Sequence, residues 1–105
     1  MTIPEKILAK SAFLIDVRND DEWNSGHAKG AIHLELSKIQ EGENSAFSKN
    51  AEIYLYCRSG SRSGVAKEIL EKEGFINIEN LGGLSDWQAL GGEIEKPRKR
   101  KIIKI

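Results

Sequence analysis

The sequence predicts an α/β domain whose sheet is mostly parallel. Two compact apolar runs, at 13–17 and 53–57, are rich in β-branched and aromatic residues and are typical of strands that are covered on both faces. Segments with helical patterns lie between and after these runs, so strands and helices alternate along the chain. Such alternation favours parallel strands joined by right-handed crossovers. A length of 105 residues is enough for one such domain and leaves no room for a second core.

The N-terminal part of the chain carries two helix-start signals. Thr2 and Glu5 have the spacing of a capping box, with a proline near the first helical position, and predict a short helix that ends before Ser11. Asn19 can cap a second short helix, for which Gly26 is the expected end. The first strand is expected between these two helices.

The central part of the chain is expected to contain a short strand at 31–34, a polar loop at 40–50 and a helix. The helical pattern follows Cys57, and Gly74 is a natural residue for its C-terminal end. One face of this helix is apolar and is expected to pack on the sheet. The residues of that face are Val65, Ala66, Ile69 and Leu70.

The C-terminal part of the chain is expected to complete the alternation. A strand is predicted at 76–79 and a turn at the glycine pair 82–83. A last helix that contains Asp86 and Trp87 follows, and a second glycine pair at 91–92 marks its end.

The composition excludes several classes of protein. Hydrophobic residues make up 39% of the chain and charged residues 30%, so the chain can bury a core and is not disordered. The single cysteine excludes an intramolecular disulfide framework and a zinc site built from several cysteines. No apolar stretch approaches the roughly 20 residues of a transmembrane helix. The N-terminus lacks a signal-peptide pattern, so the expected location is the cytoplasm, or the periplasm if a signal peptide has been removed.

The charge is balanced overall but uneven along the chain. Six of the 16 basic residues lie at 96–105, where there is no acidic residue. We therefore expect an acidic folded domain at 1–95 and a basic tail at 96–105. The tail fits a solvated terminus, a contact with an acidic protein or membrane surface, or an added strand at 101–105. It has no aromatic residue, which argues against nucleic-acid binding.

The candidate chemistry lies at 57–62, where a buried strand ends and a helix begins. In parallel α/β sheets this edge is where ligands bind. A tight loop can point its backbone N–H groups inward, and the following helix adds its positive end, so an anion is stabilised without a metal. That anion can be the thiolate of Cys57, whose pKa the cations Arg58 and Arg62 would lower further. The alternative is that Cys57 is a small packing residue at the end of a strand.

Several motifs of the chain occur in the order found in the single-domain rhodanese-type sulfurtransferases. They are Leu14-Ile15-Asp16-Val17-Arg18, Glu22-Trp23, Gly26-His27, Gly30-Ala31-Ile32, Tyr56-Cys57-Arg58-Ser59-Gly60-Ser61-Arg62-Ser63, and Asn80-Leu81-Gly82-Gly83 with Trp87. The chain resembles this family over roughly residues 12–92. The resemblance implies a rhodanese-like, five-stranded, mostly parallel sheet flanked by helices on both faces. It also implies transfer of the sulfane sulfur of thiosulfate to cyanide, a thiol or a thioredoxin-like protein, through a cysteine persulfide.

The resemblance assigns roles to individual residues. It matches Cys57 to the catalytic, sulfur-carrying cysteine. Because the transfer proceeds by two nucleophilic displacements, we expect no general base, no cofactor and no metal ion. The loop that would bind thiosulfate and the outer persulfide sulfur comprises Arg58, Ser59, Gly60, Ser61, Arg62 and Ser63.

Other polar and aromatic residues are expected to be structural. Asp16 and Arg18 lie at the end of the first strand, where a buried pair can tie neighbouring loops together. We expect His27 and His33 to be structural or surface residues, with His27 near the rim of the pocket. Trp23 is expected in the core or at the rim.

Two other kinds of function use the same loop. A cysteine phosphatase or an arsenate reductase also combines a loop thiolate with an arginine, but its loop is one residue longer than the four residues between Cys57 and Arg62. The shorter loop suits a sulfur atom better than a tetrahedral oxyanion. A non-enzymatic sulfur-relay or protein-binding module would differ only in its partner, for which the basic tail is a candidate surface.

Overall fold

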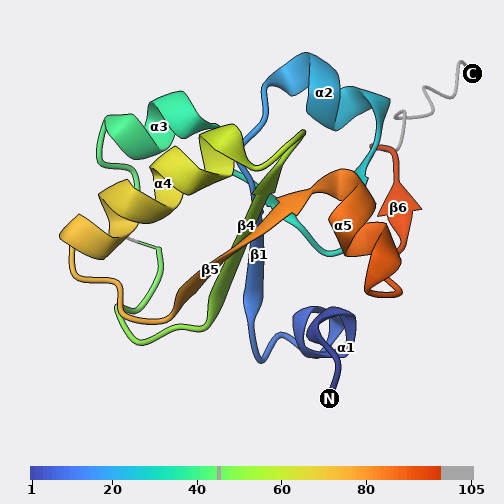
Figure 1. The fold of residues 1–105 in the computed structure, drawn as a ribbon, viewed down its shortest axis with the longest axis horizontal. Coiled ribbons are helices and arrows are strands. Elements are labelled where there is room, and N and C mark those ends of the chain that lie inside the picture. Colours follow the sequence, from blue (N-terminus) through green and yellow to red (C-terminus); the bar gives the residue numbers. More distant parts are fainter. Residues whose placement is uncertain (45, 98–105) are drawn as a thin grey trace, which may run out of the picture.

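The computed structural model describes residues 1–44 and 46–97 and contains a parallel sheet of four strands (Figure 1). All three neighbouring pairs of strands run parallel. The α/β class with a parallel sheet is therefore confirmed. The strands, in their order across the sheet, are β3 (Ile32–His33), β1 (Phe13–Asp16), β4 (Ile53–Cys57) and β5 (Ile78–Gly83).

Helices cover both faces of this sheet, as expected (Figure 1). α3 (Leu36–Gln40) and α4 (Ser61–Lys72) lie on one side, and α1 (Ile3–Leu8) and α5 (Leu84–Ala89) lie on the other. Two hydrophobic clusters separate these helices from the strands. The central strands are therefore enclosed by helices on both sides.

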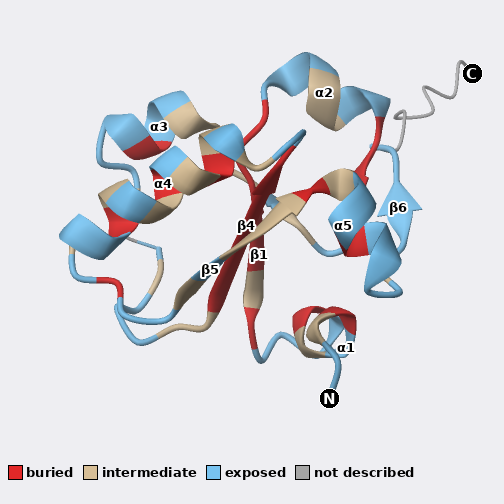
Figure 2. Cartoon of the chain, viewed as in Figure 1, coloured by how far each residue is buried: buried red, intermediate tan, exposed pale blue. Residues whose placement is uncertain are grey.

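The two clusters take alternate residues from the same strands. Ile15 and Leu55 belong to the cluster under α3 and α4, whereas Leu14 and Tyr54 belong to the cluster that contains Trp87 of α5. Successive side chains of a strand point to opposite faces, so one apolar run supplies both cores. All five residues of β4 are buried for this reason (Figure 2).

A second, small sheet accounts for the difference from the expected number of strands. β2 (His27–Ala28) pairs antiparallel with β6 (Ile94–Glu95), so the described residues give four strands in the parallel sheet where five were expected. β2 follows Gly26, at which α2 (Asp20–Ser25) ends. Gly26 has a φ of 146°, and an added Cβ there would lie 3.4 Å from Ile94. The positive φ thus favours glycine at this turn, and β6 packs against it.

Both predicted N-terminal caps are present. The Thr2 hydroxyl accepts a hydrogen bond from the Glu5 amide at 3.2 Å. The Asn19 side chain accepts one from the Glu22 amide at 2.9 Å, and the Glu22 carboxylate accepts one in return from the Asn19 amide. These local signals start α1 and α2 where the sequence predicts them.

The structure differs from the sequence-based expectation at α3 and at the end of β5. α3 was not expected; it has no side-chain cap, and it is held by tertiary packing, with Ile39 fully buried in the core. The glycine pair 82–83 is not a turn but the end of β5. A bulge between Leu55 and Tyr56 in the register of β4 and β5 lets the strand continue through these glycines.

The predicted apolar face of α4 is only partly correct. Ala66 and Leu70 are buried, but Val65 is 43% exposed. The buried stripe includes Ser63 instead, because it lies three residues before Ala66 and faces the end of β4. The polar residue Ser63 therefore occupies part of the face that packs on the sheet.

The structure describes the chain as far as Pro97. Most of the predicted basic tail, residues 98–105, lies outside the described residues, and so does the strand considered at 101–105. Within the described residues, no helix has the length and apolar character needed to cross a membrane.

Candidate active site

Cys57 is the last residue of β4, and the loop that follows it leads into α4 at the carboxyl edge of the parallel sheet. The loop turns at Gly60, whose φ of 96° is a left-handed conformation that favours glycine. An added Cβ at Gly60 would lie 3.2 Å from the Cα of Gly82 in β5. The loop is therefore pressed against β5, with the N-terminal end of α4 beside it.

The Cys57 sulfur accepts hydrogen bonds from two groups of this loop. The Gly60 amide donates at 3.0 Å and the Ser63 hydroxyl lies at 3.4 Å. Burial raises the pKa of the Cys57 thiol, but the Ser63 hydroxyl and three backbone amides of residues 59, 60 and 63 outweigh burial. The net effect lowers the pKa from its ordinary value of 9.0 to about 7. Such a thiol is substantially ionised at neutral pH.

The same sulfur is buried. Cys57 is 1% exposed and belongs to the core cluster under α3 and α4. The exposed side chains of the loop belong to Arg58, Ser59 and Ser61. Cys57 therefore lies beneath the loop, because it ends a strand that is buried on both faces.

Arg62 lies in the first turn of α4 but is bound to another element. Its guanidinium makes two hydrogen bonds to the Glu22 carboxylate of α2, at 2.6 and 2.9 Å. This hydrogen bonding is the main reason why the pKa of Glu22 falls from 4.5 to about 2. In this structure the Arg62 guanidinium is therefore already paired with a carboxylate. Sequence reasoning gave Glu22 no part in the site, although it lies within a family motif.

Arg58 lies in different surroundings from Arg62. Its side chain is exposed, and within residues 1–44 and 46–97 no carboxylate forms an ion pair with it. It borders a groove of about 360 Å³ next to the loop. The other residues that line the groove are Arg18, Glu22, Ser25, Leu84 and Ser85.

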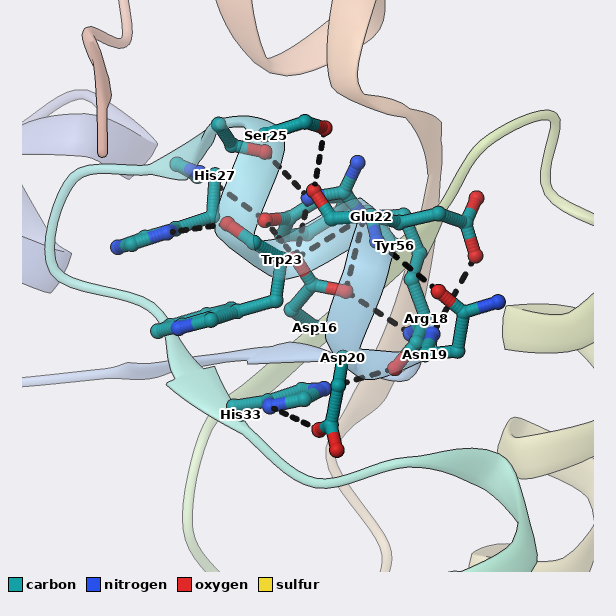
Figure 3. A network of polar contacts seen from close by, with 12 residues as sticks. Asp16, Arg18, Asn19, Asp20, Glu22, Trp23, Ser25, His27, His33 and Tyr56 are labelled. Carbon is teal, nitrogen blue, oxygen red and sulfur yellow. Dashed lines mark hydrogen bonds and ion pairs between the residues drawn. The ribbon is translucent and has the colours of Figure 1, made fainter. Parts of the chain in front are cut away.

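A buried network lies beside the site, at the end of β1 (Figure 3). The Arg18 guanidinium donates to both carboxylate oxygens of Asp16, which is 0% exposed, and to the Gly26 carbonyl at 2.7 Å. The Tyr56 hydroxyl donates to Asp16 and accepts from the Ala28 amide. Burial, and after it the bond to Asp16, raises the pKa of Tyr56. The network joins β1, β4 and β2, which is the structural role expected for Asp16 and Arg18.

Neither histidine contacts the Cys57 sulfur. His27 and His33 both stack on Trp23, with ring centroids at 3.5 and 4.7 Å (Figure 3). One ring nitrogen of each lies near a backbone carbonyl, that of Trp23 for His27 and that of Arg18 for His33. The two histidines, in β2 and β3, are therefore structural residues that pack against Trp23 of α2, as expected.

One group of described residues has the composition of a possible metal site. Ligand atoms of Asp20, His33 and Glu35 lie within 4.8 Å of one another. Asp20 is 78% exposed, and its contact with His33 is an ordinary ion-pair distance of 3.7 Å. None of the three residues contacts Cys57, so the chemistry of the loop does not involve this group.

Asn80 of β5 is the second residue that sequence reasoning left without a role. Its side-chain NH₂ donates to the Gly60 carbonyl at 3.0 Å. Its side-chain oxygen accepts from the Ser63 hydroxyl at 2.7 Å and from the Gly82 amide at 2.9 Å. The available signal was its place at the start of the motif Asn80-Leu81-Gly82-Gly83, but its partners are distant in sequence.

Comparison with known proteins identifies the family. Residues 4–90 match the rhodanese-like domain. The chain is also 41% identical over 73 residues to thiosulfate sulfurtransferase PspE of Escherichia coli (strain K12), which covers 69% of this chain and 70% of that protein. The chain belongs to the rhodanese-like domain family. Its cysteine loop and the elements around it lie within the matched residues.

The chain is also similar to a longer curated protein and to a solved structure of about the same length. The rhodanese-like domain is 34% identical over 79 residues to the putative sulfur carrier protein YrkF of Bacillus subtilis (strain 168), covering 74% of this chain and 42% of that protein. A solved structure, a rhodanese with anions from E. coli, is similar with a TM-score of 0.73 at 36% identity. That similarity covers 82% of this chain and 99% of the E. coli chain. The chain thus spans nearly a whole rhodanese structure but less than half of YrkF.

Proposed function

We propose that this rhodanese-like domain is a sulfurtransferase that moves the sulfane sulfur of thiosulfate to cyanide or a thiol through a persulfide on Cys57. The observation that carries the proposal is the environment of the Cys57 sulfur, which accepts hydrogen bonds from the Gly60 amide and the Ser63 hydroxyl. These donors favour a thiolate at neutral pH, and a thiolate is the nucleophile that sulfur transfer needs. The relative PspE, named as a thiosulfate sulfurtransferase, supports thiosulfate as the donor.

The reaction takes two displacements at sulfur. In the first, the Cys57 thiolate attacks the outer sulfur of thiosulfate, an S–S bond forms at Cys57, and the S–S bond of thiosulfate breaks. Sulfite leaves with the bonding electron pair. In the second, cyanide or an acceptor thiolate attacks the outer sulfur of the persulfide, and the Cys57 thiolate leaves. Thiocyanate or a new persulfide is released, and the protein returns to its starting state.

Neither displacement requires the protein to move a proton. The thiolate is already formed when thiosulfate binds, and sulfite leaves as an anion. The only two histidines of the chain, His27 and His33, lie near backbone carbonyls in the α2 region. The contribution of the loop to this reaction is electrostatic, because its amides stabilise the negative charge on either sulfur of the persulfide.

In this proposal the positive charge of Arg58 stabilises the negative charge of thiosulfate, the sulfur donor. Thiosulfate is a dianion, and a second anion at Cys57 would repel it. Glu22 already neutralises Arg62, whereas Arg58 is exposed at the groove beside the loop. We therefore assign Arg58 to the sulfonate end of thiosulfate and Arg62 mainly to the attachment of α2. The residues Ser59, Gly60, Ser61 and Ser63 form the rest of the cradle.

Intact mass after incubation with thiosulfate tests the proposal. We expect one added sulfur atom on the wild-type chain, its loss on addition of cyanide, and formation of thiocyanate. Cys57→Ser is the control, because the chain has no other cysteine. An unchanged wild-type mass, or the same gain in Cys57→Ser, would show that no Cys57 persulfide forms from thiosulfate.

A sulfur-relay role is the second candidate. It is favoured by the similarity to a putative sulfur carrier protein. In that case the persulfide would pass to a protein thiol, such as that of a thioredoxin-like protein, faster than to cyanide. Comparing the rate of sulfur loss with cyanide and with reduced thioredoxin separates the two roles. A phosphatase-type site is disfavoured, because Arg62 binds Glu22 and not the centre of the loop.

A further inference from the structure

Asn80 links three parts of the site through one side chain. Its NH₂ group donates to the Gly60 carbonyl at 3.0 Å, and its oxygen accepts from the Ser63 hydroxyl at 2.7 Å and from the Gly82 amide at 2.9 Å. Two of these partners, Gly60 and Ser63, are also the two groups that contact the Cys57 sulfur. Asn80 itself has no hydrogen bond to that sulfur, so any effect it has on Cys57 passes through them.

The Ser63 hydroxyl has two acceptors but only one proton. The Cys57 sulfur lies at 3.4 Å from its oxygen and the Asn80 oxygen at 2.7 Å. When Cys57 is a thiolate, Ser63 can donate to the sulfur, and the Asn80 oxygen keeps its bond from the Gly82 amide. When Cys57 is a thiol, its S–H can donate to Ser63 while Ser63 donates to Asn80. Ser63 is fully buried, so Asn80 supplies the partner that this hydroxyl needs whenever it does not serve the sulfur.

The second link holds the turn of the loop. Gly60 donates its N–H to the Cys57 sulfur at 3.0 Å, while its carbonyl accepts from Asn80 at 3.0 Å and from the Gly64 amide at 2.9 Å. Gly60 has a φ of 96°, and a glycine is the residue with the greatest backbone freedom. Fixing its carbonyl against β5 therefore limits the rotation that would carry its N–H away from the sulfur.

We propose that Asn80 is a positioning residue of the site, which holds the Gly60 carbonyl against β5 and so keeps the Gly60 amide in place as a donor to the Cys57 sulfur. The proposal deepens the proposed function, since it concerns the sulfur that would carry the persulfide. The side chain of β5 acts here on a group at the end of β4, because the two strands are neighbours in the sheet. Its contribution is specific to charge on the sulfur, whereas a purely structural bridge would affect only the stability of the fold.

The pH dependence of Cys57 alkylation by iodoacetamide tests this role without any sulfur donor. In Asn80→Ala we expect the midpoint to rise by about one pH unit, because one displaced charge-stabilising hydrogen bond has an effect of that order. The matched control is Asn77→Ala, which removes an exposed asparagine just before β5 whose side chain has no hydrogen bond within the described residues. We expect the wild-type midpoint in that control. None of these substitutions replaces a member of the charged pairs near the site, Arg62 with Glu22 and Arg18 with Asp16.

A double variant separates the route through Gly60 from the Ser63 hydroxyl. We expect Ser63→Ala to raise the midpoint, and Asn80→Ala to raise it by at least as much in the Ser63→Ala background as in the wild type, because only in the wild type does its loss free the Ser63 proton for the sulfur. A smaller rise in that background would show that Asn80 acts by supporting Ser63 and would overturn the route through Gly60. If Asn80→Ala does not fold, Asn80→Asp keeps the size of the side chain, loses the donor to Gly60 and adds a negative charge, so its midpoint must rise as well.

Thermal melting and thiosulfate turnover complete the test. A wild-type midpoint in a folded Asn80 variant, or an equal shift in Asn77→Ala, would overturn the proposal. If the alkylation midpoint of Cys57 is low in the wild type and rises in Asn80→Ala, the role of Asn80 is supported even if thiosulfate never adds sulfur to Cys57. In that case only the proposed function fails. Conversely, sulfur transfer by a wild-type chain whose alkylation midpoint does not depend on Asn80 would leave the proposed function standing and remove the role of Asn80.

Discussion

Arg58 and Arg62 have different surroundings in the structure, and these surroundings give the two side chains different roles. Arg58 and Arg62 are four positions apart, and sequence alone gives both as cations beside Cys57. In the structure the Glu22 carboxylate holds Arg62 at 2.6 Å, while Arg58 stays exposed beside the groove. A guanidinium that is already paired with a carboxylate adds less to the binding of a second anion than one that is free.

Replacement of Arg58 should therefore weaken thiosulfate binding. We expect Arg58→Ala to raise KM for thiosulfate about tenfold, which corresponds to about 1.4 kcal/mol, with a smaller change in kcat. The size is modest because the side chain is exposed and screened by solvent. Steady-state kinetics of thiocyanate formation measures both constants. Lys72→Ala, at the far end of α4, is the matched loss of an exposed cation, and an equal rise in KM there would show that only overall charge matters.

At the level of elements, the Glu22–Arg62 pair joins the start of α2 to the start of α4. Both side chains are partly exposed, by 24% for Glu22 and 35% for Arg62. Glu22 also accepts from the Asn19 amide, so one carboxylate caps its own helix and binds the next one. Because its pKa falls from 4.5 to about 2 on folding, Glu22 stabilises the fold above pH 4.5, and this stabilisation is lost as pH falls through about 2.

Glu22→Gln should remove this pH-dependent part of the stability. We expect the free energy of unfolding to fall by about 1 kcal/mol at pH 7, a value that allows for solvent screening of a partly exposed pair. The difference from the wild type should shrink at pH 3 and approach zero near pH 2. Urea unfolding followed by circular dichroism measures it. Glu71→Gln, which affects an exposed pair with Lys67 within α4, is the control and should change little. A difference that is constant between pH 7 and pH 3 would contradict this interpretation.

The helices and strands differ in how well they can be predicted from the sequence. α1 and α2 were predictable because their caps are local: Thr2 and Asn19 each bind a residue three positions later. α3 was not, because it lacks a side-chain cap and depends on the burial of Ile39 against the rest of the core. The glycines at the end of β5 favour a turn locally, but pairing with β4 through a bulge keeps them in the strand. Core packing in the case of α3, and strand pairing in the case of β5, override the local propensity.

At the level of the whole molecule, the site is assembled by the order of strands β1, β4 and β5 in one parallel sheet. Their carboxyl ends bring Asp16, Cys57 and the Asn80 motif to one edge. The cysteine loop itself is contiguous in sequence, so its place and its inward backbone amides were predictable, whereas the Ser63 hydroxyl as a donor to the sulfur was not. Glu22 and Asn80 lie 40 and 20 positions from their partners Arg62 and Gly60, and no local pattern reports such contacts. A prediction of these partners would have needed the order of the strands first.

The segment at 93–95 has a defined place in this architecture. Glu93 accepts hydrogen bonds through its carbonyl from the Trp87 indole and from the Lys29 amide, each at 2.8 Å, and β6 then pairs with β2. Trp87 is 1% exposed, so its N–H would be left buried without a partner if these residues were removed. We propose that the segment 1–95 is the folding unit.

Two truncated chains test this inference. A chain that ends at Pro97 keeps β6, and we expect its melting temperature and its kcat/KM for thiosulfate to match those of the full chain. A chain that ends at Gly92 loses β6 and the partner of Trp87, and we expect its free energy of unfolding to be lower by about 1–3 kcal/mol, the cost of leaving buried polar groups unpaired. Chemical unfolding of the three chains side by side measures the difference. Equal stability of the two truncated chains would show that β6 contributes nothing. Loss of activity on removal of residues 98–105, with an unchanged melting temperature, would assign the basic tail a part in sulfur transfer.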